Sequence, residues 1–213
     1  LIAKVLPELQ TLRGVVLMGP REEEAAAMID GLLFHDDLVA EGDDDYTWPE
    51  FDELSPSSLC YTSGTTGNPK GVLYTHRSTV LHSYGANQPD GLALKGSDTV
   101  MPVVPMFHVN AWGVPYVAAA MGCKMALPGP GLDGESLVRL INAEEVTVAL
   151  GVPTIWMGLL GALEKAGETS LSLQRTIVGG SALPPSMIKI FRDRYGVELI
   201  HAWGMTETSP IGS

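Results

Sequence analysis

Residues 175–202 read RTIVGGSALPPSMIKIFRDRYGVELIHA, and this stretch predicts a strand, a helix and a second strand. The β-branched run over 175–178 favours a strand, and so does the apolar run over 198–202. Residues 184–195 begin with two prolines and end before Gly196, which are typical start and stop signals of a helix. The segment keeps its apolar side chains on one helical face: Met187, Ile188, Phe191 and Tyr195. Such a unit is typical of a parallel sheet.

The same alternation of short β-branched runs and helix-period segments extends along the chain. Further strands are predicted at 14–18, 58–62, 70–74, 99–105, 123–127 and 146–150. Further helices are predicted at 76–88, 110–121, 133–144 and 154–166. The pattern indicates an α/β fold, with one or more mostly parallel sheets flanked by helices. Ligands of such folds bind beyond the carboxyl ends of the strands.

Composition and charge restrict the class of protein. The chain has 213 residues, of which 45% are apolar and 18% charged, so it can bury a core and is not a disordered chain. The net charge of −12 argues against a nucleic acid or an anionic membrane held by a basic face. Thirteen of the 25 acidic residues lie within 22–53, which contains no Lys or Arg. We therefore predict an irregular acidic connection over 19–57, more typical of a solvated loop than of a metal-binding one.

Cysteine use and hydropathy bear on the compartment. Cys60 and Cys123 have no partner spacing, so we expect neither a disulfide framework nor a zinc site, and a reducing, cytoplasmic location. The opening residues LIAKVLPELQ do not resemble a signal peptide. Residues 99–123 lack charged side chains, but three prolines interrupt them, so we expect no transmembrane segment.

A loop rich in glycine and hydroxyl side chains, TSGTTGNPKG, lies at 62–71 between two predicted strands. Its backbone N–H groups and hydroxyls favour wrapping an anion, and Lys70 adds a positive charge. A plain hairpin turn does not account for four hydroxyls and a lysine in nine residues. The loop is not a Walker A motif, because Pro69 precedes the lysine and Gly71 replaces the required Ser or Thr. The pattern therefore predicts a phosphate-binding loop of another kind.

This loop resembles the phosphate-binding signature of the adenylate-forming (AMP-binding) superfamily, which includes acyl-CoA synthetases, luciferases and peptide-synthetase adenylation domains. Three further segments agree with that family, in its order: MPVVPMFHVNAW at 101–112, VGGSALP at 178–184 and WGMTET at 203–208. The FHVNAW sequence is most similar to medium- and long-chain fatty-acid ligases and to methylthiopropanoate ligases. The resemblance covers about 58–213, the motif-bearing α/β core, and implies that 1–213 is the central part of the N-terminal AMP-binding domain.

Taken alone, each later motif has a simpler interpretation. Glu207 is typical of a solvated residue near a helix start, and His108 and Trp112 are typical of a core, where both face one side if a helix begins near His108. The resemblance instead implies catalytic roles for Lys70, His108, Thr206 and Glu207. It implies that Mg²⁺ binds Thr62 and Glu207, two hard oxygen donors.

The resemblance also implies the ligand contacts. The acyl chain is expected to contact His108, Val109, Trp112 and Gly179, with Trp112 as a gate. Trp203 is expected to stack on the adenine. The full set expected to bind ATP or AMP is Thr62, Ser63, Gly64, Thr65, Thr66, Gly67, Lys70, Gly180, Ser181, Ala182, His201, Ala202, Trp203, Gly204, Met205 and Thr206.

The activity implied is that of an ATP-dependent acid–CoA ligase acting on a medium- or long-chain fatty acid, with ATP and CoA as co-substrates and Mg²⁺ as the metal. The family's ribose-binding Asp and its C-terminal domain, with a catalytic lysine, are absent from this sequence, so we expect the isolated chain to be inactive. Two alternatives are an adenylation domain that serves a carrier protein and a catalytically silent nucleotide-binding fragment. A homodimer is left open.

Overall fold

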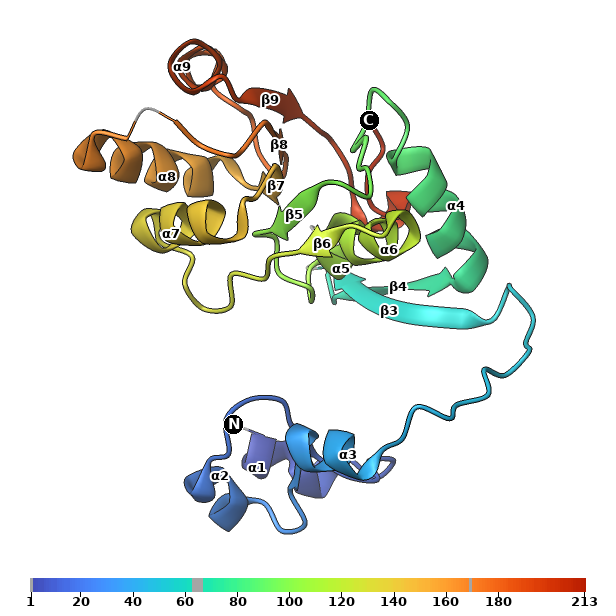
Figure 1. Cartoon of the computed structure of the whole chain (residues 1–213). Coiled ribbons are helices and arrows are strands. Elements are labelled where there is room, and N and C mark those ends of the chain that lie inside the picture. The colour runs from blue at the N-terminus through green and yellow to red at the C-terminus, as the bar shows by residue number, and fades with distance from the viewer. Residues whose placement is uncertain (1, 63–66, 169) are drawn as a thin grey trace. The chain divides into compact units, whose positions relative to one another are not determined.

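The computed structural model describes residues 2–62, 67–168 and 170–213, which form two compact units, one ending at Glu50 and one covering Phe51–Ser213 (Figure 1). The first unit pairs two short parallel strands, β1 and β2. Its elements are α1 (Ile2–Val5), η1 (Leu6–Glu8), β1 (Val16–Leu17), α2 (Glu23–Met28), β2 (Leu33–Phe34) and α3 (His35–Glu41). None of the described residues 2–50 is buried, so this unit has no core of its own.

The acidic stretch over 19–57 is more ordered than the irregular connection that we expected. It contains α2, β2 and α3, and the boundary between the two units falls inside it, after Glu50. Glu23 and Glu24 lie in the first turn of α2, where negative charge interacts favourably with the helix dipole. These helices have six and seven residues and bury no side chain, so they lack the apolar periodicity by which a sequence reveals a helix.

A five-stranded parallel sheet forms the centre of the second unit, in the order β6-β5-β7-β8-β9. This confirms the predicted α/β class. Its strands are β5 (Thr99–Pro102), β6 (Lys124–Met125), β7 (Val148–Gly151), β8 (Arg175–Val178) and β9 (Glu198–His201). The helices of this unit are α4 (His76–Ala86), α5 (Val109–Trp112), α6 (Val114–Met121), α7 (Gly134–Glu144), α8 (Pro153–Ala166) and α9 (Pro185–Tyr195), with a 3-10 turn, η2, at Thr206–Thr208.

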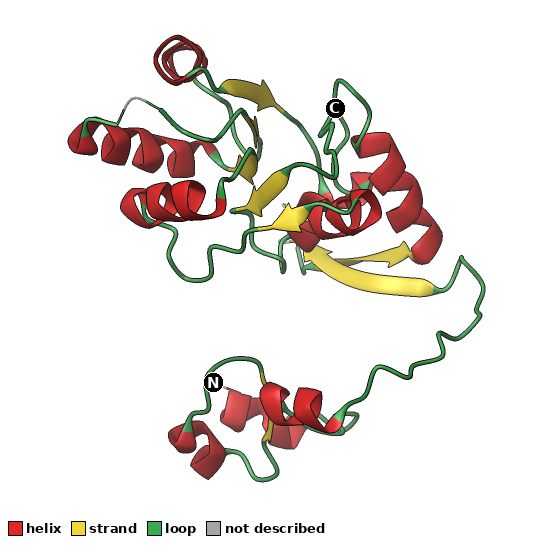
Figure 2. Cartoon of the chain, viewed as in Figure 1, coloured by secondary structure: helices red, strands yellow, loops and turns green. Residues whose placement is uncertain are grey.

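Helices cover both faces of this sheet, as the ribbons in Figures 1 and 2 show. Successive strand residues point to opposite faces, and the two hydrophobic clusters follow this alternation: Met101, Ala149 and Val178 belong to one, and Val100, Val148 and Ile177 to the other. The first cluster includes residues of α7, α8 and α9, and the second includes residues of α5 and α6. The sheet is therefore buried on both sides.

The predicted strands at 58–62 and 70–74 form a separate antiparallel pair, β3 (Pro56–Thr62) and β4 (Lys70–Thr75). Cys60 and Tyr74 on this pair are buried in the same cluster as α6, so the hairpin packs beside the parallel sheet instead of extending it. The hairpin is continued by α4, whose N-cap Thr75 accepts a hydrogen bond from the Ser78 amide in a capping box.

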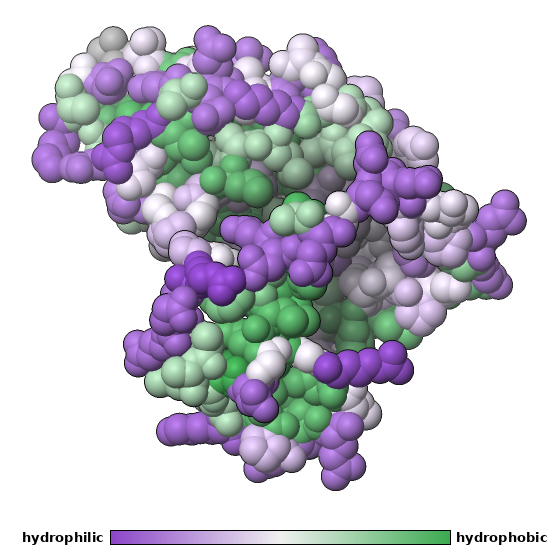
Figure 3. Space-filling view, turned by 60° about the horizontal axis from the view of Figure 1, so that its bottom comes forward, coloured by the Kyte–Doolittle hydropathy of each residue, from purple (hydrophilic) through white to green (hydrophobic). Residues whose placement is uncertain are grey.

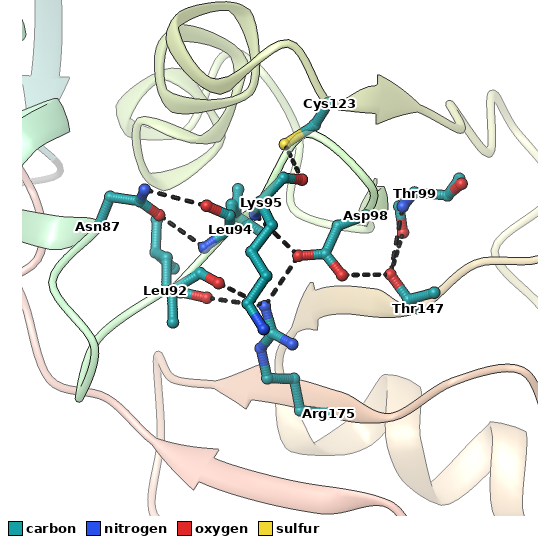
Figure 4. Close-up of polar contacts among 10 residues, drawn as sticks. Asn87, Leu92, Leu94, Lys95, Asp98, Thr99, Cys123, Thr147 and Arg175 are labelled. Atoms are coloured by element: carbon teal, nitrogen blue, oxygen red, sulfur yellow. Dashed lines mark hydrogen bonds and ion pairs between the residues drawn. The ribbon is translucent and has the colours of Figure 1, made fainter.

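The amino-terminal edge of the sheet is closed by a buried polar network (Figure 4). Arg175 Nη2 lies 3.1 Å from Asp98 Oδ2, and both side chains are at most 14% exposed. The Thr147 hydroxyl donates to Asp98 Oδ1 at 2.8 Å, and the Lys95 amide donates to Oδ2 at 2.9 Å. Arg175 also donates to the Ala93 carbonyl at 2.8 Å. The network ties the starts of β5, β7 and β8 together, away from the carboxyl ends where ligands of such sheets bind.

Both cysteines are free thiols, Cys60 buried and Cys123 partly exposed. Across the described ranges no helix is long and apolar enough to cross a membrane. Many large apolar side chains are nevertheless exposed, and green apolar patches lie between purple hydrophilic residues in Figure 3.

Candidate functional site

A cavity of about 430 Å³ lies where the carboxyl ends of the strands meet the β3–β4 hairpin. Its walls come from segments far apart in the sequence, which follow β5, β8 and β9 and include both ends of the loop between β3 and β4. The lining residues are Thr62, Lys70, His108, Val109, Trp112, Gly179, Gly180, Ala202, Trp203, Gly204, Met205, Thr206, Glu207, Pro210 and Ile211.

The glycine-rich loop begins and ends at this cavity. Thr62 closes β3, Lys70 opens β4, and the two residues are paired across the hairpin, so both line the cavity. Ser63, Gly64, Thr65 and Thr66 lie outside the described residues. The hairpin therefore delivers a hydroxyl and an ammonium group to one wall.

The wall that follows β9 is a closed turn over 203–213. The Met205 amide donates to the Pro210 carbonyl at 3.0 Å, and the Gly212 amide donates to the Trp203 carbonyl at 2.9 Å. The Tyr74 hydroxyl, from β4, donates to the Thr206 carbonyl. Burial, with the nearby Cys60 and Glu207, raises the pKa of Tyr74 to about 12, so its hydroxyl stays a donor at neutral pH. These bonds hold Thr206 and Glu207 against the cavity.

The opposite wall contains an unusual left-handed turn. Val109, Asn110, Ala111 and Trp112 all have positive φ, between +37° and +56°. Such a run is strained for residues with a Cβ, and the side chain of Asn110 anchors it by donating to the Ser58 hydroxyl at 3.0 Å. The predicted helix over 110–121 is therefore wrong at its start: it divides at Gly113 into α5 and α6.

This turn also corrects the expected relation of His108 and Trp112. We expected them to share a face of a right-handed helix, but α5 is left-handed, and they line the same cavity through that turn instead. Trp112 is only 7% exposed and packs in the core cluster, yet its ring also lines the cavity. A Cβ on Gly179 would lie 3.1 Å from this ring and 3.1 Å from the Ala202 carbonyl, so the close approach favours glycine.

The structure brings most of the expected site residues to this one cavity, but not all of them. Gly67, Ser181, Ala182 and His201 are described and do not line it, so their assignment to nucleotide binding stays a prediction. The His201 ring instead lies 3.3 Å from the Ser181 carbonyl. Pro210 and Ile211 line the cavity although we did not expect them. They reach it because the chain folds back and bridges Gly204 to Ile211, for which the sequence carries no signal.

Two oxygen donors of this cavity fit the implied Mg²⁺. Thr62 and Glu207 both line it, and their hydroxyl and carboxylate groups are of the hard oxygen kind that Mg²⁺ prefers. Among the described residues no cluster of three or more His, Cys, Asp and Glu is placed to hold a metal. A cation here would therefore need further oxygens from a bound phosphate or from water, as is usual for Mg²⁺ in nucleotide sites.

A family model described as AMP-binding enzyme matches residues 7–213. The chain belongs to this family. The match confirms the resemblance inferred from the four motifs, and it extends over the whole acidic stretch that precedes them.

Similar proteins include acid–CoA ligases. The chain is 61% identical to 3-methylmercaptopropionyl-CoA ligase of Ruegeria pomeroyi and 58% identical to medium-chain-fatty-acid–CoA ligase of Ectopseudomonas oleovorans. All of the chain is covered in both comparisons, against 40% and 39% of those proteins. The chain thus spans about 40% of the length of these relatives.

Solved structures share the fold. The anthranilate CoA ligase AuaEII in complex with anthranoyl-AMP has a TM-score of 0.81 at 23% identity, over 99% of this chain and 40% of that protein. The N-terminal domain of FACL13 from Mycobacterium tuberculosis has a TM-score of 0.75 at 24% identity, over 98% of this chain and 50% of that one.

Proposed function

We propose that this chain carries the ATP- and acid-binding cavity of an AMP-forming acid–CoA ligase. The observation that carries the proposal is that one cavity is lined by Lys70 from the glycine-rich loop, by Glu207 from the closed turn and by Trp112 from the left-handed turn. The family and the names of the relatives support an acid–CoA ligase, and because the chain spans about 40% of their length, ligase activity is proposed for the whole protein.

The reaction proceeds in two steps. A carboxylate oxygen attacks the α-phosphorus of ATP as the bond to the pyrophosphate oxygen breaks, which yields an acyl-adenylate and pyrophosphate. The sulfur of CoA then attacks the acyl carbon, AMP leaves with the electron pair of the broken C–O bond, and the thiol proton passes to solvent. The first step places negative charge on the leaving pyrophosphate, and the second places it on the leaving AMP, so the protein contributes mainly by positioning and by neutralising charge.

Each wall has a part in this reaction. Lys70 and the Thr206 hydroxyl bind phosphate oxygens, and Trp203, which is 56% exposed, offers a ring for the adenine. His108 lies beside the acid carboxylate, and Trp112 limits the acyl chain. A Mg²⁺ ion held by Thr62 and Glu207 would neutralise charge on the phosphates.

The proposed substrate is a medium- or long-chain fatty acid or a short thioether acid. The names of the relatives support both kinds, since one is a 3-methylmercaptopropionyl-CoA ligase and another a medium-chain-fatty-acid–CoA ligase. The lining by Val109 and Trp112 favours an apolar chain over a charged one. We also propose a cytoplasmic location.

Calorimetric titration of this chain tests the nucleotide part. We expect ATP·Mg²⁺ to bind, and Glu207→Gln to weaken ATP·Mg²⁺ by about tenfold while leaving AMP without metal nearly unchanged, because only the metal complex uses the carboxylate. Glu198→Gln is the matched control, since Glu198 is exposed at the start of β9 and does not line the cavity. No binding at millimolar ATP would contradict the proposal.

Acid-dependent exchange of pyrophosphate into ATP, followed by a CoA-thioester assay, tests the activity of the whole protein. We expect both reactions, with octanoate and 3-methylmercaptopropionate as the first acids. Exchange without thioester formation would favour an adenylation domain that serves a carrier protein. Binding without exchange would favour a catalytically silent module.

A further inference from the structure

His82, on α4, lies behind both walls of the cavity and does not line it. Its Nε2 accepts a hydrogen bond from the Ile211 amide at 3.2 Å, and Ile211 lines the cavity on the nucleotide side. Its Cε1 and Nδ1 lie 2.8 Å from the point that a Cβ on Gly113 would occupy, directly after Trp112 on the acid side. One imidazole ring therefore contacts both segments.

The chemistry of the ring suits this position. Because Nε2 accepts a hydrogen bond, the ring hydrogen is on Nδ1 and the imidazole is neutral. Burial lowers the pKa of His82, which favours that neutral form at pH 7. Gly113 has no Cβ, which lets the ring approach the backbone closely, and its φ of +78° is a second reason for glycine at this position.

The space around His82 leaves no room for a ligand of its own. The cavity there has a volume of about 10 Å³ and is lined by parts of α4, the left-handed turn and residues 209–210. That volume holds about one water molecule. A substrate-binding role for His82 is therefore disfavoured, and a role through its neighbours is favoured.

We propose that His82 is a positioning residue that fixes the separation of the two walls, so that an acyl-adenylate spanning both is bound in register. The proposal rests on the proposed function above. His82 lies 129 positions from Ile211 in the sequence and does not line the cavity, yet its ring accepts a hydrogen bond from the Ile211 amide, which belongs to a lining residue. A positioning role explains this arrangement. The affinity of a ligand that contacts both walls depends on their separation, whereas AMP contacts mainly one wall and its affinity depends on the separation much less.

The test compares two ligands on four chains. Calorimetry measures AMP and N-octanoyl sulfamoyladenosine, a stable mimic of the acyl-adenylate, on the unaltered chain, His82→Leu, His82→Gln and His76→Leu. Leucine fills similar space but leaves the Ile211 amide unpaired, whereas the glutamine amide oxygen restores an acceptor near the Nε2 position. His76→Leu is the matched control on the same helix, since His76 packs against Phe51 and lines neither cavity.

We expect His82→Leu to weaken binding of the acyl-adenylate mimic about tenfold, a loss of the size expected when a buried amide is left unpaired. AMP binding should weaken by less than about threefold, because AMP contacts mainly one of the two walls. His82→Gln should recover most of the loss, and His76→Leu should bind both ligands as the unaltered chain does. Equal losses for both ligands, no loss in His82→Leu, or no recovery in His82→Gln would overturn the proposal. If the unaltered chain binds neither ligand, the proposed function fails as well, so the two failures are distinguishable.

A second variant covers the case in which His82→Leu does not fold. Gly113→Ala keeps His82 but places a methyl group 2.8 Å from its ring, which must then move away from Ile211. We expect the same selective loss of the mimic over AMP, together with faster hydrogen exchange of the Ile211 amide. Unchanged exchange and unchanged selectivity in a folded Gly113→Ala chain would overturn the proposal.

Discussion

At the scale of single residues, one hydrogen bond from Tyr74 holds in place the closed turn over 203–213, which forms the nucleotide wall of the cavity. Its hydroxyl donates to the Thr206 carbonyl although 132 positions separate the two residues. In Tyr74→Phe this carbonyl loses its partner, so we expect a loss of about 1 kcal/mol in stability and a similar loss in AMP binding free energy. Urea unfolding and calorimetry measure both. Tyr84→Phe is the control, because Tyr84 is 62% exposed on α4.

The raised pKa of Tyr74, about 12, adds a pH signature to the same substitution. A raised pKa means that the neutral hydroxyl is favoured in the folded state, so its contribution is complete below the ordinary value of 10.0 and is lost as the pH rises toward 12. Ultraviolet titration of the six tyrosines should show one group ionising near pH 12 that is missing in Tyr74→Phe. Titration of every tyrosine near pH 10 would contradict this.

Also at the residue scale, Trp112 both packs in the hydrophobic core and lines the cavity. Replacing it by phenylalanine removes bulk beside Gly179, and we expect the preference among acyl-adenylate mimics to shift by about threefold toward longer chains. Trp156→Phe is the matched core control, because Trp156 is fully buried on the other face of the sheet and does not line the cavity. A uniform loss of affinity across chain lengths would leave Trp112 as core alone.

At the scale of elements, α7 and α8 pack closely against each other at Gly134. A Cβ on Gly134 would lie 2.2 Å from the Gly158 carbonyl oxygen and 2.9 Å from the Ala162 Cβ, so the two helices must separate to accept it. We expect Gly134→Ala to destabilise the fold by about 2 kcal/mol, as overpacking does.

A second glycine of the same helix pair supplies the contrast. Gly161 lies in the interior of α8 with open space at its Cβ position, so Gly161→Ala should stabilise the fold by about 0.5 kcal/mol through helix propensity alone. Thermal and urea unfolding of the two variants should thus shift in opposite directions. Equal shifts would show that α7 and α8 are not packed through Gly134.

For the whole molecule, the Asp98–Arg175 pair at the amino-terminal edge is the least exposed of the ion pairs among the described residues. Burial by itself would raise the pKa of Asp98, but bonds from Lys95 and Thr147 and the charge of Arg175 outweigh it, and the net pKa lies below its ordinary value. Asp98→Asn leaves the Arg175 charge buried without its partner, so we expect a loss of about 3 kcal/mol. Asp193→Asn, in an exposed pair with Arg192, should change stability by less than about 1 kcal/mol.

This difference should depend on pH in a defined direction. Because the folded pKa of Asp98 is lowered, its contribution is present above the ordinary value of 3.8 and is lost as the pH falls through the folded value. The gap in unfolding free energy between the unaltered chain and Asp98→Asn should therefore be constant near pH 7 and shrink below about pH 4. A gap that grows on acidification would contradict the assignment.

The α/β class, the parallel sheet and the family could be predicted from the sequence because their signals are local. The β8–α9–β9 unit shows this: period, proline start and glycine stop all lie within 175–202, and the structure reproduces β8 residue for residue. The site motifs were also predictable in part, since each follows a strand and the carboxyl ends of parallel strands meet at one edge.

Tertiary structure alone decided how those motifs meet. The left-handed turn at 109–112 opposes the intrinsic backbone preference of its residues. It is held by a hydrogen bond to Ser58 of β3, which is distant in the sequence, so no local pattern predicts it. Pro210 and Ile211 reach the cavity through a bridge to Gly204, and His82 and Tyr74 reach its walls across more than 120 positions. Contacts between residues so distant depend on how complete elements pack, and neither propensity nor periodicity carries that information.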